Sequence, residues 1–191
     1  MHMHLAPVRL VGLSGSLRQA SFSRATLVGL RNNLPDKVEL DILDLQLPLY
    51  NEDEDGVDAP MRVKLLREAI AGSDGIVIAT PEYNHGIPGV LKNAMDWASR
   101  PYGKCCLINK PALVISVSPA FTGGVRAHAQ ANETLLSIPA HVMGGPQIVI
   151  GGIGEKVRDG ALVDEASLTF ALAALRRMIT LSRRGSRELL V

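Results

Sequence analysis

The sequence contains 191 residues, a length that predicts one compact domain rather than two. Hydrophobic residues make up 47% and charged residues 20%, a composition typical of globular proteins that excludes global disorder. The 20 basic and 19 acidic side chains leave a net charge of +1, so the chain has no general electrostatic attraction for nucleic acid.

The apolar runs and the cysteines bear on membrane insertion, secretion and disulfide bonding. No run approaches the roughly 18 apolar residues that a membrane helix needs, and the start lacks a secretory pattern, so we expect a cytoplasmic protein without membrane contact. Residues 1–6 are left out of the fold prediction as a disordered start or a cloning remnant. The two cysteines, Cys105 and Cys106, are adjacent and cannot cross-link distant segments, so they are predicted to be reduced thiols in a loop.

The first half of the chain predicts two strands and two helices. Residues 8–13 form an apolar run that breaks at small residues, and leucines at helical spacing then predict a helix from about residue 23 to Pro35. Residues 38–43 alternate apolar and acidic side chains, as expected of a strand near a sheet edge. The acidic stretch 51–58 predicts a solvated loop, with metal binding as a weaker alternative, and a helix over about 60–71 follows.

The second half continues the alternation of strands and helices. Residues 75–79 are apolar throughout, which predicts a central strand buried on both faces. Pro88 then begins a helix that ends before Pro101. The remaining predicted elements are a strand over 112–117, a helix over about 125–136, a strand region at Val142 and 147–150, and a helix from near Asp164.

Five strands that each lead into a helix predict a doubly wound α/β fold with a five-stranded parallel sheet and helices on both faces, in a single domain over 1–191. In such sheets, ligands bind beyond the carboxyl ends of the strands. Three loops lie at those ends, namely 14–23, 81–88 and 118–124. We therefore expect these loops to build the functional site.

The first loop has the residues of a phosphate cradle. Amides at a helix start carry partial positive charge, the serine hydroxyls donate hydrogen bonds, and Arg18 adds a forked cation. The loop lacks both the glycine spacing of a dinucleotide fingerprint and the Gly-Lys-Ser/Thr of a triphosphate loop, so a single terminal phosphate fits best. A capped helix start, with the serines as turn residues, is the alternative.

Residues 12–16, Gly-Leu-Ser-Gly-Ser, also approach the Gly-x-Ser-x-Gly nucleophile elbow of hydrolases. The final glycine is missing. His85 or His128 would have to act as the base, and neither position follows the hydrolase order of serine, acid and histidine. A hydrolase is therefore the weaker alternative for this loop.

The other two loops favour a flat ligand. The second loop is rich in Gly and Pro, so it offers rigid backbone donors beside Tyr83, where a planar heterocycle would lie. Glu82 as a solvated loop residue and Trp97 as ordinary packing are the alternatives there. In the third loop, glycines allow close approach of the backbone to a ring that Phe121 would cover, and a plain strand-to-helix turn is the alternative.

Two motifs together resemble the NAD(P)H-dependent FMN reductase family, which includes bacterial quinone, chromate and azo-dye reductases with a flavodoxin-like fold. They are Gly-Ser-Leu-Arg-x-x-Ser over 15–21 and Pro-Glu-Tyr-Asn-x-Gly-x-Pro-Gly over 81–89, the second continued by Leu-Lys-Asn-Ala-x-Asp-Trp over 91–97. The resemblance extends over nearly the whole chain. It implies FMN as the cofactor, NADPH or NADH as co-substrate, and assembly into a homodimer or homotetramer.

The resemblance also implies which residues contact FMN. The first loop contributes Ser16, Leu17, Arg18, Ser21 and Ser23, with the hydroxyls and Arg18 on the phosphate, although relatives often have asparagine where Ser23 stands. The second loop lines the isoalloxazine with Pro81, Glu82, Tyr83 and Asn84, mostly through backbone groups and ring contact. The third loop contributes Ser118, Gly123 and Gly124, although residues 119–122 depart from the shorter glycine-rich pattern of the family.

The reaction implied by the resemblance needs no catalytic side chain and no metal, because a bound flavin carries the hydride chemistry. NAD(P)H is expected to pass hydride to the flavin N5 and leave, after which a quinone, azo compound, free flavin or metal oxyanion takes its place. The chain has no second dinucleotide fingerprint, which favours this use of one pocket in turn and predicts ping-pong kinetics.

Two other functional classes remain open. A flavodoxin-type electron carrier would exchange single electrons with protein partners, but the net charge of +1 and Arg18 differ from the acidic surface of such carriers. A non-catalytic module would bind FMN without turnover. A redox role for the adjacent cysteines is disfavoured by the strain of closing a ring between neighbours and by their separation in sequence from the three loops.

Overall fold

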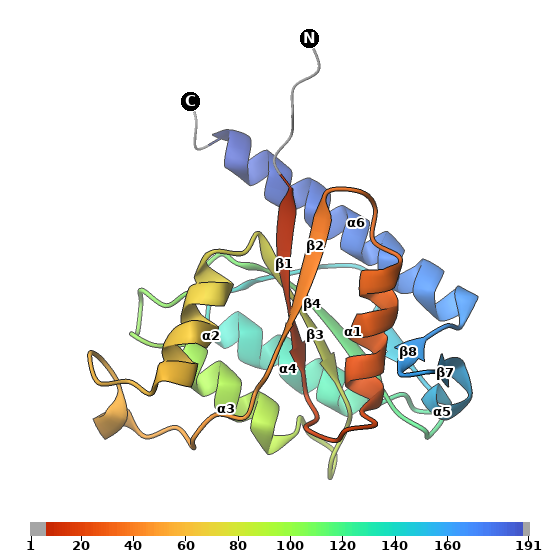
Figure 1. Cartoon of the computed structure of the whole chain (residues 1–191), viewed down its shortest axis with the longest axis horizontal. Coiled ribbons are helices and arrows are strands. Elements are labelled where there is room, and N and C mark those ends of the chain that lie inside the picture. The colour runs from red at the N-terminus through yellow and green to blue at the C-terminus, as the bar shows by residue number, and fades with distance from the viewer. Residues whose placement is uncertain (1–6, 189–191) are drawn as a thin grey trace.

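The computed structural model describes residues 7–188, so the predicted start at residues 1–6 lies outside the described residues. A parallel sheet forms the middle layer, and helices cover both of its faces (Figure 1). Its strands are β1 (Val8–Ser14), β2 (Val38–Leu43), β3 (Gly75–Thr80), β4 (Pro111–Val117), β5 (His141–Val142) and β6 (Ile148–Ile150). They are arranged in the order β2-β1-β3-β4-β5, with β6 also paired to β4. This is the predicted doubly wound, flavodoxin-like α/β fold.

The helices are divided between the two faces of the sheet (Figure 1). They are α1 (Phe22–Asn32), α2 (Met61–Ala71), α3 (Gly89–Ala98), α4 (Val125–Ser137) and α6 (Glu165–Glu188). Successive strand residues point to opposite faces, so Leu10 packs in the core with α1 and α6, whereas Val11 packs in the core with α2, α3 and α4. Each helix therefore buries its apolar stripe against one side of the same sheet.

The strand positions follow the hydrophobic patterns. β3 is buried at every residue and lies between β1 and β4, because an unbroken apolar run can be accommodated only where helices cover both faces. β2 alternates buried and exposed residues over its first four positions and lies at the edge. Both predictions are confirmed.

The last strand region lies where it was predicted, at Val142 and within 147–150, but it consists of two separate strands. The fifth position is shared by two short strands, since β5 pairs with Pro111 and Ala112 while β6 pairs with Ile115 to Val117. Between them lie Gly145, which has a φ of 125°, and Pro146, which has no N–H to donate to a ladder. These two residues explain why the pairing is interrupted.

The region before the final helix contains elements that the sequence patterns did not predict. They are α5 (Ile153–Lys156), β7 (Val157–Arg158) and β8 (Ala161–Leu162). The two strands form an antiparallel hairpin around Asp159 and Gly160, which both have positive φ. Two-residue strands are too short for a periodic pattern, although Asp-Gly is a hairpin signal. The final helix begins beside Asp164, whose carboxylate accepts a hydrogen bond from the Ser167 N–H at 2.9 Å.

The prediction of a solvated loop over 51–58 is wrong in part. Residues Glu52–Glu54 form a 3₁₀ turn, and Asp55 pairs with Arg67 of α2 at 2.8 Å, with both side chains less than a fifth exposed. Burial opposes ionisation of Asp55, but hydrogen bonds from Arg67 and the Gly56 N–H outweigh it and hold its pKa below the ordinary value. The partner of Asp55 lies on a separate helix, so the local acidic composition gave no sign of it.

Side chains of α3 hold the chain that precedes this turn. The Asn93 side chain accepts a hydrogen bond from the Tyr50 N–H at 2.7 Å and donates one to the Pro48 carbonyl at 2.9 Å. The indole N–H of Trp97 donates to the same carbonyl at 2.9 Å. Trp97 is fully buried and is therefore a packing residue, which was one of the two interpretations of its motif.

The adjacent cysteines are reduced thiols in a loop, as predicted. Cys105 and Cys106 are free thiols in the loop after α3, and burial, followed by the neighbouring Cys105, raises the pKa of the Cys106 thiol to about 11. Such a thiol stays protonated near neutral pH and is a poor nucleophile.

Within residues 7–188, no helix is both long and apolar enough to cross a membrane.

Candidate flavin site

The three predicted loops meet at the carboxyl edge of the sheet, which is the lower edge in Figure 1. They surround a hollow of about 200 Å³. Its wall includes Ser16, Arg18 and Ser23 from the first loop, Pro81, Glu82 and Tyr83 from the second, and Ser118 from the third. The Tyr83 Oη lies 3.5 Å from the Ser16 Oγ, so the first two loops touch across the hollow.

Gly15 allows the first loop to lie directly against the end of β3. Its N–H donates to the Ala79 carbonyl at 2.8 Å. A Cβ at this position would lie 2.8 Å from the Thr80 Oγ1 and 3.0 Å from the Pro81 Cδ, which is too close for any larger residue. The glycine of the first motif therefore has a packing role that brings the two loops together.

The serines of the first loop have different local roles. The Ser21 Oγ caps α1 by accepting a hydrogen bond from the Arg24 N–H at 3.2 Å, as the capped-helix interpretation expected. The Ser16 Oγ accepts from the Arg18 N–H at 3.3 Å. Each hydroxyl still has a proton that it can donate to an anion, so capping and phosphate binding are compatible.

Ser23 is the residue whose surroundings point most directly to a ligand. Its side chain is only 1% exposed, it lines the hollow, and its Oγ has no hydrogen-bond partner among the described residues. A buried hydroxyl without a partner destabilises a fold by about 1–3 kcal/mol. An anionic oxygen in the hollow would accept its proton and remove that cost.

The second loop forms a tight hairpin. Tyr83 and Gly86 each donate a backbone hydrogen bond to the other's carbonyl, both at 3.0 Å. Between them, Asn84 and His85 have φ values of 49° and 67°, as in the two-residue turns that suit antiparallel pairing. Tyr83 is 47% exposed, so much of its ring surface remains available for contact.

Glu82 is a helix cap rather than a solvated residue. Its carboxylate, on a side chain that is 12% exposed, accepts hydrogen bonds from the backbone N–H groups of Arg126 at 2.9 Å and Ala127 at 3.2 Å, at the start of α4. Burial opposes its ionisation, but these bonds and the Arg126 guanidinium hold the pKa of Glu82 below the ordinary value. Glu82 is therefore an ionised group with fixed partners, which makes it a poor proton donor.

The backbone conformation of the third loop requires its two glycines. Gly123 and Gly124 have φ values of 61° and 83°, and a Cβ on Gly123 would lie 2.5 Å from the Val149 Cγ1. The Ser118 Oγ accepts a hydrogen bond from the Ala120 N–H at 3.1 Å, which tightens the turn. Phe121 is 94% exposed and so covers no part of the described chain.

Some predicted residues adjoin the hollow without lining it. They are Ser21, Asn84, Gly123 and Gly124, whereas Leu17 lines a neighbouring hollow of about 260 Å³ on the side of β2. The prediction did not include Phe22, Val117 and Pro119, which do line the site. The Arg18 guanidinium carbon lies 6.0 Å from the centre of the Phe22 ring. The position of Phe22, directly after a capping serine at the edge of the phosphate loop, is a signal that could have indicated it.

The hydrolase alternative has no support in this geometry. The Ser14 hydroxyl donates to the Ser16 carbonyl at 3.2 Å. His128 is 4% exposed within α4, and its Nδ1 lies 3.1 Å from the Asn132 side-chain nitrogen. A nucleophilic serine needs a base within hydrogen-bond reach, and the His128 ring instead contacts Asn132 and the Val114 backbone.

The buried His128 is expected to make stability fall in mild acid. Burial lowers its pKa below the ordinary value, and a backbone hydrogen bond with Val114 only partly opposes this. The unfolded chain then binds the proton more readily, so the free energy of unfolding decreases as pH falls below about 6.5 towards the folded-state pKa and is unaffected above that window. Urea unfolding curves between about pH 5.5 and 7.5 measure the slope, which His128→Gln should reduce.

The exposed His141 of β5 provides the control for this experiment. His141→Gln should leave the slope of unfolding free energy against pH as it is in the wild type. Equal slopes in the His128→Gln variant and the wild type would show that His128 does not cause the acid sensitivity.

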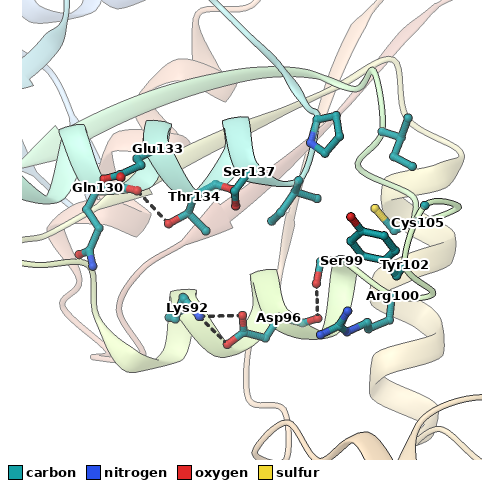
Figure 2. Close-up of a pocket in the computed structure, with 14 residues that line it drawn as sticks. Lys92, Asp96, Ser99, Arg100, Tyr102, Cys105, Gln130, Glu133, Thr134 and Ser137 are labelled. Carbon is teal, nitrogen blue, oxygen red and sulfur yellow. Dashed lines mark hydrogen bonds and ion pairs between the residues drawn. The ribbon is translucent and has the colours of Figure 1, made fainter.

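A separate groove of about 590 Å³ lies between α3 and α4, and none of the predicted site residues lines it (Figure 2). On α3, the Lys92 ammonium pairs with the Asp96 carboxylate at 2.7 Å, so the charges of this wall are already paired. Cys105 also lines the groove. We place the candidate site at the smaller hollow because ligands of doubly wound sheets bind at the carboxyl edge, where the three loops meet.

Comparison with known proteins identifies the family. The model of the NADPH-dependent FMN reductase family matches residues 8–155. The chain belongs to this family. A quinone reductase of Pseudomonas putida is 36% identical over 164 residues, which cover 85% of this chain and 88% of the relative. An NAD(P)H-dependent FMN reductase of Pseudomonas aeruginosa is 37% identical over 144 residues, covering 75% of this chain and 77% of the relative.

A solved structure extends the similarity to three dimensions. The flavoenzyme NAD(P)H:(acceptor) oxidoreductase FerB from Paracoccus denitrificans superposes with a TM-score of 0.83 at 33% identity, covering 93% of this chain and 98% of FerB. The protein is thus an oxidoreductase with FMN as its cofactor and NAD(P)H as its reductant. The unpaired Ser23 hydroxyl, Arg18 and the start of α1 fit the phosphate of that cofactor.

Proposed function

We propose that this FMN reductase family member is a two-electron reductase of small-molecule acceptors, in which NAD(P)H and the acceptor use one open face of the site in turn. The observation that carries the proposal is the convergence of three loops on a hollow lined by Arg18 and by the buried Ser23 hydroxyl, which has no partner among residues 7–188. That arrangement has the donors for a single phosphate and lacks the glycine spacing for a dinucleotide.

In this proposal the first loop holds the phosphate of FMN. Ser16, Ser21 and Ser23 donate their hydroxyl protons, and the Arg18 guanidinium supplies the positive charge. Leu17, 52% exposed on the outer side of the loop, contributes through its backbone. Because Ser21 also caps α1, the same residue fixes the helix start and the anion site.

The other two loops position the flat part of the cofactor. One wall is formed by Pro81 and the Tyr83–Gly86 hairpin, which has Asn84 at its turn. The Glu82 carboxylate keeps its hydrogen bonds to the start of α4. Beside this wall, the third loop contributes Ser118, Gly123 and Gly124, where the glycines allow the backbone to approach closely. FMN, when bound, supplies the hydride chemistry that connects NAD(P)H with the acceptor.

The proposed reaction uses no side chain as acid or base. Glu82 is ionised and capped on α4, and His128 is buried. The residues that line the hollow bind and orient FMN and leave space beside it for the substrates. This arrangement permits acceptors of several kinds. Quinones are favoured by the names of the relatives, and azo compounds, free flavin and metal oxyanions are the other proposed acceptors. Ping-pong kinetics are expected because both substrates need the same face.

The proposal includes a homodimer or homotetramer of single-domain chains. The apolar side chains of Leu49 and Val57 are 82% and 86% exposed, and a second copy would remove such surface from water. Light scattering measures the mass in solution. A monomeric mass would contradict this part of the proposal and leave the reductase assignment untouched.

An anaerobic titration tests the proposed reaction. The protein is reconstituted with FMN, and its visible spectrum is recorded while NADPH, and separately NADH, is added. Bleaching of the flavin band by one equivalent of reductant is the expected result, followed by stoichiometric reoxidation with a quinone. A bound flavin that stays oxidised with both reductants would instead favour an electron carrier or a non-catalytic flavin-binding module.

Ser23→Ala is expected to have opposite effects on the fold and on FMN binding. It removes a buried hydroxyl without a partner and replaces serine by a better helix former, so the FMN-free protein should be as stable as the wild type or more stable. The FMN dissociation constant should rise about 3- to 30-fold through the lost phosphate contact. Thermal unfolding of the FMN-free protein and fluorescence titration with FMN measure the two effects. Unchanged FMN affinity would remove Ser23 from the site.

A further inference from the structure

Gln130 of α4 connects that helix to the hairpin of the second loop. Its Oε1 accepts a hydrogen bond from the Ile87 N–H at 2.7 Å. A Cβ on Gly86 would lie 2.7 Å from the same oxygen, so a larger residue at position 86 would displace the Gln130 amide. Figure 2 shows the Gln130 side chain leaving α4 on the side that faces α3, the helix into which the second loop leads. Gln130 was absent from the predicted site because nothing in its sequence neighbourhood indicates this contact.

A second contact joins the other end of the loop to the same helix face. The Glu82 carboxylate accepts hydrogen bonds from the N–H groups of Arg126 and Ala127 at the start of α4. Gln130 follows these residues by four and three positions, which places it one turn further along the same face. The loop is therefore tied to α4 just before and just after the Tyr83–Gly86 hairpin.

The two contacts differ in which segment supplies the hydrogen-bond donor. At Glu82 a loop side chain accepts from helix backbone, and at Gln130 a helix side chain accepts from loop backbone. The hairpin's own backbone bonds join only Tyr83 and Gly86, so they fix its shape but not its orientation. The hairpin faces the first loop, where the Tyr83 Oη lies 3.5 Å from the Ser16 Oγ, and the two bonds to α4 lie on either side of it in the chain.

We propose that Glu82 and Gln130 form a clasp that orients the hairpin against the flavin site, with Gln130 as its positioning residue. The inference rests on the proposed function in one respect, that the hairpin is a wall of the FMN site. A wall held in place before FMN arrives lowers the ordering cost of binding, so the clasp strengthens FMN binding without contact between Gln130 and FMN.

Gln130→Leu tests the clasp because it removes the acceptor while keeping a side chain of similar bulk. The FMN dissociation constant, measured by fluorescence quenching, should rise about three- to tenfold, as expected for one lost hydrogen bond. In the FMN-free protein, amide exchange at Ile87 should accelerate by a similar factor. Gln130→Glu retains an acceptor oxygen and should restore both values to within about twofold.

Glu133→Leu is the matched control, since Glu133 is an exposed residue of α4 one turn from Gln130. It should leave both the FMN affinity and the exchange rate unchanged. Wild-type values for both quantities in Gln130→Leu would overturn the clasp. Faster exchange with unchanged FMN affinity would overturn the positioning role.

FMN binding by the wild type and amide exchange at Ile87 distinguish a failure of the proposed function from a failure of the clasp. A wild-type protein that fails to bind FMN contradicts the proposed function directly. The exchange rate at Ile87 does not require FMN, so an unchanged rate in Gln130→Leu overturns the clasp even in that case. Recovery in Gln130→Glu supports a specific acceptor role, because a general loss of packing would not be repaired by a charged side chain.

Discussion

Arg18→Ala should weaken FMN binding by about 1.5–3 kcal/mol, which raises the dissociation constant about 10- to 150-fold. The guanidinium is the cationic group of the first loop, it lines the hollow, and it lies above the Phe22 ring rather than in an ion pair with a carboxylate of the described chain. A phosphate would therefore be its main charged partner. Fluorescence titration with FMN measures the affinity, and titration with riboflavin, which lacks the phosphate, should show a much smaller effect.

Arg31→Ala is the control for this experiment, because Arg31 is an exposed arginine in the last turn of α1, at the end of that helix far from the loop. It changes the net charge equally and should leave FMN affinity within about twofold of the wild type. If Arg18→Ala binds FMN as tightly as Arg31→Ala does, the phosphate assignment is wrong.

Trp97→Ala should lower the free energy of unfolding by about 3–5 kcal/mol. The indole is fully buried and meets the Tyr50 ring edge-on, with ring centres 4.9 Å apart. Its N–H donates to the Pro48 carbonyl, and its own carbonyl accepts two hydrogen bonds from Arg67. Truncation would leave a cavity between α3 and the chain that precedes the 3₁₀ turn, so that segment should loosen first.

Urea unfolding followed by circular dichroism is the suitable measurement, because Trp97 is the single tryptophan of the chain and its removal abolishes the fluorescence signal. Trp97→Phe should cost only about 1–2 kcal/mol, since most of the packing remains and Asn93 still donates to Pro48. Tyr102→Ala, at an aromatic residue that is 89% exposed, should change stability by no more than about 0.5 kcal/mol. A similar small loss in Trp97→Ala would contradict the packing role.

The elements with strong periodic patterns were predictable from the sequence. The central and edge positions of β3 and β2 follow from unbroken and alternating hydrophobicity, and the helices begin and end close to their proline and glycine signals. The last strand region was predicted at Val142 and 147–150, where β5 and β6 lie, whereas the β7-β8 hairpin was not predicted because two-residue strands carry too little pattern. Cytoplasmic location and a chain-wide single domain stay predictions.

The candidate site was predictable as three loops but not as a set of contacts. Strand order alone brings the loops together, since parallel strands end at one edge. Which side chains face the hollow depends on turns that sequence does not specify: Leu17 points to a neighbouring hollow, whereas Phe22 lines this one. The partners of Glu82 and Ile87 on α4 lie more than 40 residues away in the chain.

The sequence by itself determined the fold class, the edge of the sheet where the site lies and the family, because hydrophobic periodicity and contiguous motifs are local properties of the chain. Only the tertiary structure decided which polar groups are satisfied within the protein. It pairs Asp55 with Arg67, bonds Glu82 to the start of α4, and leaves the Ser23 hydroxyl buried without a partner among residues 7–188. Hydrogen bonding and desolvation depend on distances between distant segments, and those distances exist only once the chain has folded.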